Sequence, residues 1–311
     1  MLQRKILFFI FLMTPLLSRA DLAEEPPKPS ESWEQMFIES DLAIAEWFNG
    51  AAQGLDLFLA RKQLTRKQNK TTIKLENSTY SAEGQALKNN LGVNVDLKLP
   101  NVEEYWHLKF TSYDEIEANR GVRNSYLRET PRATNYGTTV GLFKKLGNVR
   151  TAFQPRVEFQ GRLKISHSLS FESVADLKKY EVNPKLEFYA NPDKGAGIFE
   201  ALNFNFKLSK TNTLTFANDG DYQDKIHLYT VNNAVSLGRM LNDKENMSYT
   251  AVFTSTNQPC YHLDSYTFAV SYSRLVYKNI LDFQISPHVD FSNALSFKRN
   301  LGLTLNVDLI F

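Results

Sequence analysis

From Thr71 to Phe311 the chain alternates apolar and polar residues with a period of two. Between Asn90 and Leu99, for example, leucine or valine occupies every second position, and similar runs cover 198–208 and 281–291. Successive side chains of a strand point to opposite faces, so these runs predict strands with one apolar face. Each run has about 10 residues, as a tilted membrane-spanning strand requires, whereas strands in soluble sheets average about 5–6.

The alternation divides into fourteen predicted strands: 71–81, 89–99, 104–113, 134–146, 149–160, 163–174, 179–190, 197–208, 212–219, 225–238, 247–256, 264–276, 279–289 and 301–311. An even number of strands with both ends on the periplasmic side is typical of bacterial membrane barrels. We therefore predict that 71–311 forms an all-β, transmembrane, antiparallel up-and-down β-barrel. Tight turns are expected at Pro100-Asn101, Gly147-Asn148, Ser209-Lys210 and Lys278-Asn279, and outer loops at 114–133, 191–196, 257–263 and 290–300.

One join between predicted strands carries no obvious turn. The apolar positions keep the same parity from Phe153 to Phe171. A single strand from residue 149 to 171 would be about 75 Å long, at ~3.3 Å per residue, far taller than a bilayer. We therefore place a break at Gly161-Arg162, and a barrel of twelve strands is the alternative.

The last strand has an unbroken apolar face that ends at the final residue. This face consists of Leu301, Leu303, Leu305, Val307, Leu309 and Phe311. An alternating last strand with a terminal aromatic residue resembles the C-terminal signal of Gram-negative outer-membrane barrel proteins. The resemblance implies insertion into membrane lipid, with the barrel-assembly machinery and periplasmic chaperones as partners.

A second resemblance covers most of the chain. Trp47-Phe48 before 55–59, then Leu97-Lys98-Leu99-Pro100, then Tyr277-Lys278-Asn279 with 282–287, is similar to a group of uncharacterised proteobacterial outer-membrane proteins. That group has no assigned activity. The likeness therefore implies the architecture and adds nothing about function.

The N-terminal part has a different pattern. Residues 1–20 combine Arg4 and Lys5 with an apolar run and a small-residue cleavage site, which indicates a secretory signal peptide. Residues 21–31 are acidic and proline-rich, as in a flexible lead-in. From Ser32 to Leu59 apolar residues recur at three- and four-residue steps, which predicts an amphipathic helical segment within 32–70. This segment either plugs the barrel or contacts its periplasmic rim or the membrane.

Composition narrows the function classes. Mean hydropathy is −0.36, which also suits a barrel because half of each strand faces a polar lumen. A net charge of +2 gives no indication of nucleic-acid binding. Cys260 is the only cysteine, and the five histidines form no cluster with metal-ligand spacing, so neither a metal nor another cofactor is expected.

If the apolar parity faces lipid, charged residues of both signs face the lumen. The candidates include Arg150, Arg156, Glu158, Lys164, Glu187, Asp282 and Asp308; the same parity adds Lys74, Glu76, Asp96, Lys98, Lys109, Arg162, Glu172, Glu181 and Lys185. A strongly selective pore would carry a ring of one sign. The mixture instead fits an interior of paired charges with a narrow or occluded passage, or simply an ordinary polar lumen.

Two further features were weighed as functional sites. The segment 114–133 carries four arginines, which suit the phosphates of lipopolysaccharide, although a solvated outer loop is the simpler interpretation. Lipid hydrolases of the outer membrane need a histidine and a serine two positions apart on one strand face. His167 and Ser168 are adjacent and therefore point to opposite faces, so no catalytic residues are predicted.

Taken together, the sequence predicts an exported outer-membrane barrel. A passive channel or transport protein with a narrow or partly plugged lumen is the leading hypothesis. A structural or interaction barrel without a conducted solute is the alternative, and a lipid-modifying enzyme comes third.

Overall fold

The computed structural model describes residues 71–98, 106–122, 135–159, 163–276 and 280–311. Within these ranges the chain forms one antiparallel sheet. Its strands are β1 (Thr72–Ala82), β2 (Lys88–Lys98), β3 (Trp106–Thr111), β4 (Gly137–Leu146), β5 (Val149–Glu158), β6 (Lys164–Ser173), β7 (Ala175–Asp176), β8 (Tyr180–Asn191), β9 (Gly195–Lys207), β10 (Asn212–Gln223), β11 (Leu228–Asn242), β12 (Glu245–Thr256), β13 (His262–Val276), β14 (Leu281–Ser292) and β15 (Arg299–Ile310).

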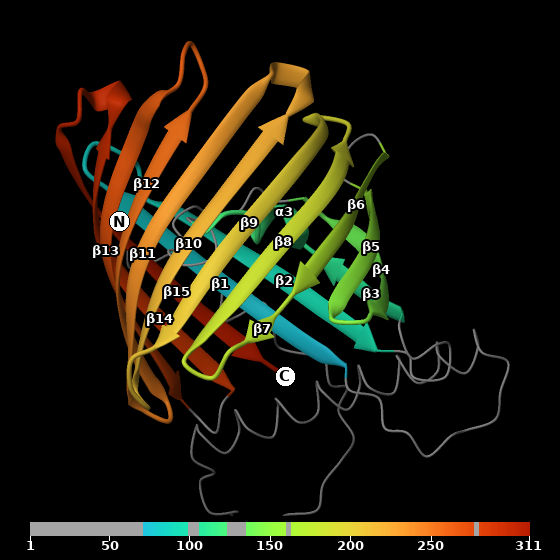
Figure 1. The fold of residues 1–311 in the computed structure, drawn as a ribbon, viewed down its shortest axis with the longest axis horizontal. Helices are drawn as coiled ribbons and strands as arrows, with labels where there is room; N and C mark the ends of the chain where they lie inside the picture. The colour runs from blue at the N-terminus through green and yellow to red at the C-terminus, as the bar shows by residue number, and fades with distance from the viewer. Residues whose placement is uncertain (1–70, 99–105, 123–134, 160–162, 277–279) are drawn as a thin grey trace, which may run out of the picture. The chain divides into compact units, whose positions relative to one another are not determined.

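The sheet closes on itself. Neighbours in sequence pair with each other, and the circle is completed by β1 with β15 and by β6 with β8. In Figure 1 strands β8–β12 slant one way across the front, while β1, β2 and β15 slant the other way behind them. Such a tilt is what barrel closure requires. The predicted antiparallel up-and-down barrel is therefore confirmed, with fourteen long strands and the two-residue β7 as an addition to β8.

The predicted break in the long apolar run is real. Strand β5 pairs with β6 from Val149↔Ser173 to Glu158↔Lys164, as a hairpin does. The dipeptide Gly161-Arg162 itself lies outside the described residues. The alternative of twelve strands is wrong, since it required this hairpin to be a single element.

Two predicted strands were too short at one end. Strands β10 and β11 remain paired as far as Gln223↔Leu228, beyond the predicted ends at 219 and 225. The polar run Asp219-Gly220-Asp221 interrupts the alternation, yet its backbone continues the ladder. The predicted loop 290–300 likewise shrinks to 293–298, because β14 and β15 pair up to Phe291↔Arg299.

The two faces of the barrel wall have opposite chemistry. Outward positions such as Leu163 (67% exposed), Ile165 and Phe188 are apolar and exposed, whereas buried inward positions are mostly polar. The most buried of these polar side chains are Arg156, Glu187, Thr267, Ser286 and Thr304. A soluble protein buries its apolar face instead, so this inverted distribution is that of a barrel surrounded by lipid.

The connections sort into two ends. At one end lie Phe311 and tight turns, including Gly147-Asn148 and the β9–β10 turn at 208–211. The predicted turns Pro100-Asn101 and Lys278-Asn279 lie outside the described residues. At the other end lie the connections after β1, β3, β8, β12 and β14, of which the β3–β4 connection is by far the longest. This end is called the outer end below.

Phe311 lies beside the first strand. Its backbone N–H donates to the Ile73 carbonyl at 2.8 Å, and Ile73 donates to the Phe311 carbonyl at 3.2 Å. The Phe311 ring packs against a cluster of Ile73, Val95 and Leu97. The last residue therefore takes part in joining the two ends of the sheet.

Helical structure is minor in the described ranges. It comprises α3 (Glu115–Ala118) and the 3-10 turns η3 (Asp224–Ile226) and η5 (Asn293–Leu295). No described helix is both long and apolar enough to cross a membrane. The predicted signal peptide (1–20), lead-in (21–31) and helical segment (32–70) lie outside the described residues and stay predictions.

Candidate functional site

The connection after β3 enters the barrel. We call its described part, Ser112–Val122, the crossing segment. Strand β3 is seven strands away from β11 in either direction around the fourteen, yet the crossing segment reaches β10 and β11. The segment contains α3, whose first N–H groups are capped by the Asp114 carboxylate at 3.0 and 3.1 Å. The interpretation of 114–133 as a solvated outer loop is therefore wrong for 114–122, and Arg123, Arg128 and Arg132 lie outside the described residues.

Arg120 holds the crossing segment to the wall at β8. Its guanidinium donates from Nε and Nη2 to Glu187 Oε1 at 2.9 and 2.6 Å. The guanidinium also lies 3.6 Å from the centre of the Tyr189 ring, within cation–π range. The Glu187 side chain is 1% exposed and also pairs with Lys185 at 3.2 Å. Two cations therefore balance this carboxylate, which limits the cost of burying its charge.

The tip of the segment rests against the far wall. The Val122 N–H donates to Asp219 Oδ2 at 2.5 Å, and Asn232 donates to Asp219 Oδ1 at 2.7 Å. The Val122 side chain packs on small apolar residues that interrupt the polar lumen wall on β10–β13: Ala217, Ala234, Val252 and Ala269. A polar anchor and an apolar contact thus hold the same residue.

Ion pairs hold both sides of α3. Lys109 on β3 pairs with Glu115 at 3.0 Å. Lys194, in the β8–β9 turn, pairs with Glu117 at 2.6 Å. These side chains are between 24% and 36% exposed, so each pair contributes modestly, and together they add to the orientation given by Arg120.

Arg156 supports the base of the segment. Its side chain is 1% exposed, and it donates to the Thr111 hydroxyl at 2.6 Å and to the Asn135 carbonyl at 2.5 Å. The guanidinium lies over Gly137, where an added Cβ would be 2.8 Å from Arg156 Cζ. Because Thr111 and Asn135 flank the β3–β4 connection on its two sides, Arg156 draws both ends of that connection towards β5.

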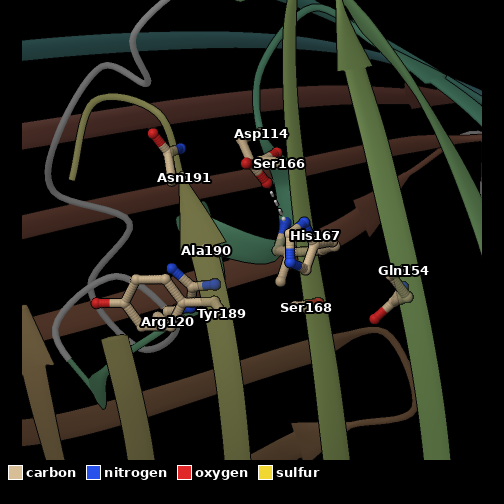
Figure 2. A pocket seen from close by; sticks show the side chains of 10 residues that line it. Asp114, Arg120, Gln154, Ser166, His167, Ser168, Tyr189, Ala190 and Asn191 are labelled. Carbon is tan, nitrogen blue, oxygen red and sulfur yellow. Dashed lines mark hydrogen bonds between the residues drawn. The ribbon is translucent and has the colours of Figure 1, made fainter. Parts of the chain in front are cut away.

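A polar recess of about 240 Å³ lies between the crossing segment and strands β5, β6 and β8 (Figure 2). Side chains that line it include Asp114, Arg120, Gln154, Ser166, Ser168 and Tyr189. Ser168 is 2% exposed, and its hydroxyl has no hydrogen-bond partner among the described residues. The recess therefore offers hydroxyl, amide, carboxylate and guanidinium groups to the contents of the lumen.

A second charge cluster lies at the β1–β15 seam. Lys74 pairs with Glu76 at 2.6 Å and with Asp308 at 2.9 Å. Asp282 is in register with Asp308 on the neighbouring strand and is partly buried. A lysine between carboxylates lowers their mutual repulsion in the lumen.

The remaining lumen candidates occupy different heights. Glu158 is 5% exposed and shares the inward face with Arg156, the two lying 4.0 Å apart. Arg150 is exposed at the tight-turn end, over the Phe143 ring. Lys164 lies near the outer end and pairs with Asp193 at 2.5 Å. The described charges thus form local pairs of mixed sign.

Sequence reasoning missed the roles of Arg120, Tyr189 and Asp219. Tyr189 and Asp219 lie on strands with the inward parity, and Tyr189 donates to Asp221 at 2.7 Å. The only available signal was Gly197, which lies opposite Tyr189 and leaves room for its ring. A glycine opposite an aromatic residue on an inward face is a pattern that could have identified this contact.

The histidines considered for hydrolysis are separated. His167 is exposed, while Ser166 and Ser168 are buried on the opposite face. His288 is inward and 5% exposed, and it stacks on Tyr80 at 5.6 Å. Its Nε2 lies 3.5 Å from Asp290. In the described ranges, no group of three His, Cys, Asp or Glu side chains is arranged to hold a metal ion.

No protein-family model and no curated protein match the sequence. Solved structures with a similar fold include OccK11 (OpdR) of Pseudomonas aeruginosa, with 7% identity, a TM-score of 0.47 and coverage of 78% of this chain and 96% of that one. The outer membrane channel DcaP of Acinetobacter baumannii has 8% identity, a TM-score of 0.46 and coverage of 78% and 97%. A loop-deletion mutant of OmpT, an outer membrane protein of Vibrio cholerae, has the same identity and TM-score, with coverage of 78% and 99%. These similarities at low identity carry no information about a solute.

Proposed function

We propose that the protein is an outer-membrane channel for small polar solutes, and that the crossing segment narrows its passage. The observation that carries the proposal is the course of Ser112–Val122 from β3 to the opposite wall. A barrel that served only as an anchor would gain nothing from a charged segment inside its lumen. The predicted signal peptide and the apolar outer face support the outer-membrane location.

The lumen chemistry supports polar solutes of either sign. Described charges on the wall and on the crossing segment are paired over short distances, as in Arg120–Glu187 and Lys74–Asp308. A ring of one sign, which would give strong charge selectivity, is not formed by the described residues. We therefore expect weak ion selectivity, with size as the main limit on passage.

Single-channel recording in planar bilayers tests this function. The purified full-length protein is compared with a variant in which residues 115–121 are replaced by a glycine-serine linker of equal length. We expect both to conduct, with larger current steps for the variant, because Arg120 and the α3 carboxylates no longer occupy the lumen.

A replacement of residues 85–87, in an exposed turn at the same end, is the control. Its current steps should match those of the wild type. Absence of conductance from the wild type and from the linker variant would exclude a channel and favour a structural or interaction barrel.

A further inference from the structure

Five aromatic rings gather on the outside of the barrel at the outer end. We call Phe253, Tyr266, Phe268, Phe291 and Phe297 the aromatic platform. Tyr266 is at its centre and stacks on Phe291 at 4.6 Å and on Phe297 at 5.8 Å between ring centroids. Phe253 and Phe268 meet Tyr266 at 6.3 and 5.9 Å. The rings therefore form one continuous surface.

Strand register explains why the rings share a face. Tyr266 on β13 is opposite Phe253 on β12 and Phe291 on β14, so the three point to the same side of the sheet. Phe253, Phe268 and Phe297 remain 38%, 46% and 36% exposed. The platform thus presents aromatic surface to whatever surrounds the barrel.

The loop that supplies Phe297 is held in an uncommon conformation. Ser296 and Phe297 both have left-handed backbones, with φ of 52° and 54°, which non-glycine residues adopt at a cost. The Phe297 N–H donates to the Ser292 carbonyl at 2.8 Å and stabilises this geometry. The strained turn directs the ring onto Tyr266 and keeps it out of solvent-exposed loop positions.

Two cations border the platform at the rim. Arg299 is directly opposite Phe291 in register and is exposed on the same outward face, and the exposed Lys298 precedes it. Neither forms an ion pair with any described residue. The nearest carboxylate on the adjoining strand end, Glu83, accepts the Leu301 N–H at 3.2 Å. Positive charge therefore lies next to an aromatic surface without a protein anion to neutralise it.

We propose that this surface binds lipid A, the phosphorylated and acylated anchor of lipopolysaccharide. Arg299 and Lys298 contact a phosphate at the rim, and the acyl chains lie on the aromatic platform. The choice of lipid A rests on the proposed outer-membrane location, which puts the outer end in the lipopolysaccharide leaflet. The site lies outside the barrel and is separate from the crossing segment.

Lipid binding to the full-length protein in neutral detergent tests the proposal. The probes are bisphosphorylated lipid A, the same lipid with both phosphates removed, and phosphatidylglycerol. We expect the wild type to bind bisphosphorylated lipid A about tenfold more tightly than the dephosphorylated form. The double variant Lys298→Gln/Arg299→Gln should lose this preference, whereas Phe297→Ser should weaken both forms alike.

Arg239→Gln is the matched control. Arg239 is also an exposed arginine on the outward face, but it lies at the tight-turn end opposite Met247. Its variant should bind as the wild type does, and all variants should retain heat-modifiable migration as a sign of folding. Equal affinity of the wild type for both lipid A forms, or equal affinity for phosphatidylglycerol, would overturn the proposal. Channel conductance is measured separately, so failure here leaves the proposed function untouched.

Discussion

The substitution Arg120→Ala isolates the strongest anchor of the crossing segment. It removes two charge-assisted hydrogen bonds to Glu187 and the contact with the Tyr189 ring. Loss of one partner of a buried ion pair costs about 3–5 kcal/mol when the other charge is left alone. Here Lys185 still pairs with Glu187 at 3.2 Å, so we expect a smaller cost of about 2–4 kcal/mol.

That cost shifts the balance between docked and released states of the segment. A change of 2–4 kcal/mol corresponds to a roughly 30- to 700-fold change in the equilibrium. Val122–Asp219 and Lys194–Glu117 remain, so the segment is loosened and not lost. We therefore expect added current levels and more frequent transitions in single-channel recordings, with the main level raised or unchanged.

Arg274→Ala is the control, since it removes the same charge from an exposed pair with Glu245 at the tight-turn end. A double-mutant cycle of Arg120→Ala with Glu187→Gln should return a coupling energy of about 1–3 kcal/mol. Recordings of Arg120→Ala that coincide with those of Arg274→Ala would refute the reasoning, because they would show that docking at Glu187 has no effect on the passage.

Three further changes test other parts of the structure. Gly302→Val places a Cβ 2.1 Å from His288 Nε2, so we expect a loss of about 1–3 kcal/mol, seen as a lower temperature of the heat-modifiable shift; Gly238→Val, with its nearest atom at 3.8 Å, should have a weaker effect. Phe311→Asp should reduce the assembled fraction on gels, while Phe311→Tyr assembles normally, because the terminal aromatic packs beside Ile73. Deletion of 21–69 should raise conductance if the predicted helical segment plugs the barrel, and unchanged conductance would favour rim or membrane contact instead.

The barrel wall could be predicted because its signal is local. A period of two is visible within ten residues, and it determines both the strand and the face to which each side chain points. The inward positions of Arg156, Glu158, Glu187 and Asp308 follow from this parity alone, and the structure buries all four. Even the hairpin between β5 and β6, with no clear turn residue, followed from the limited height of a membrane.

The course of the crossing segment could not be predicted in the same way. Its residues have no periodicity, and its anchors are distant in sequence: Arg120 and Glu187 are 67 residues apart, and Val122 and Asp219 are 97 apart. A charged, irregular connection suits solvent as well as a polar lumen, so composition does not distinguish the two. Closure of the barrel decides the matter, because only the closed wall brings β8 and β10 within reach of β3.

The outer face shows the same division. The sequence by itself determined that Phe253, Tyr266, Phe268 and Phe291 face outward, since each occupies an apolar position of an alternating strand. Whether they meet depends on register between strands, and Phe297 joins them only through a left-handed turn in a loop. Parity is a property of one strand, whereas the meeting of side chains depends on how strands and loops pack, and that was decided by the tertiary structure.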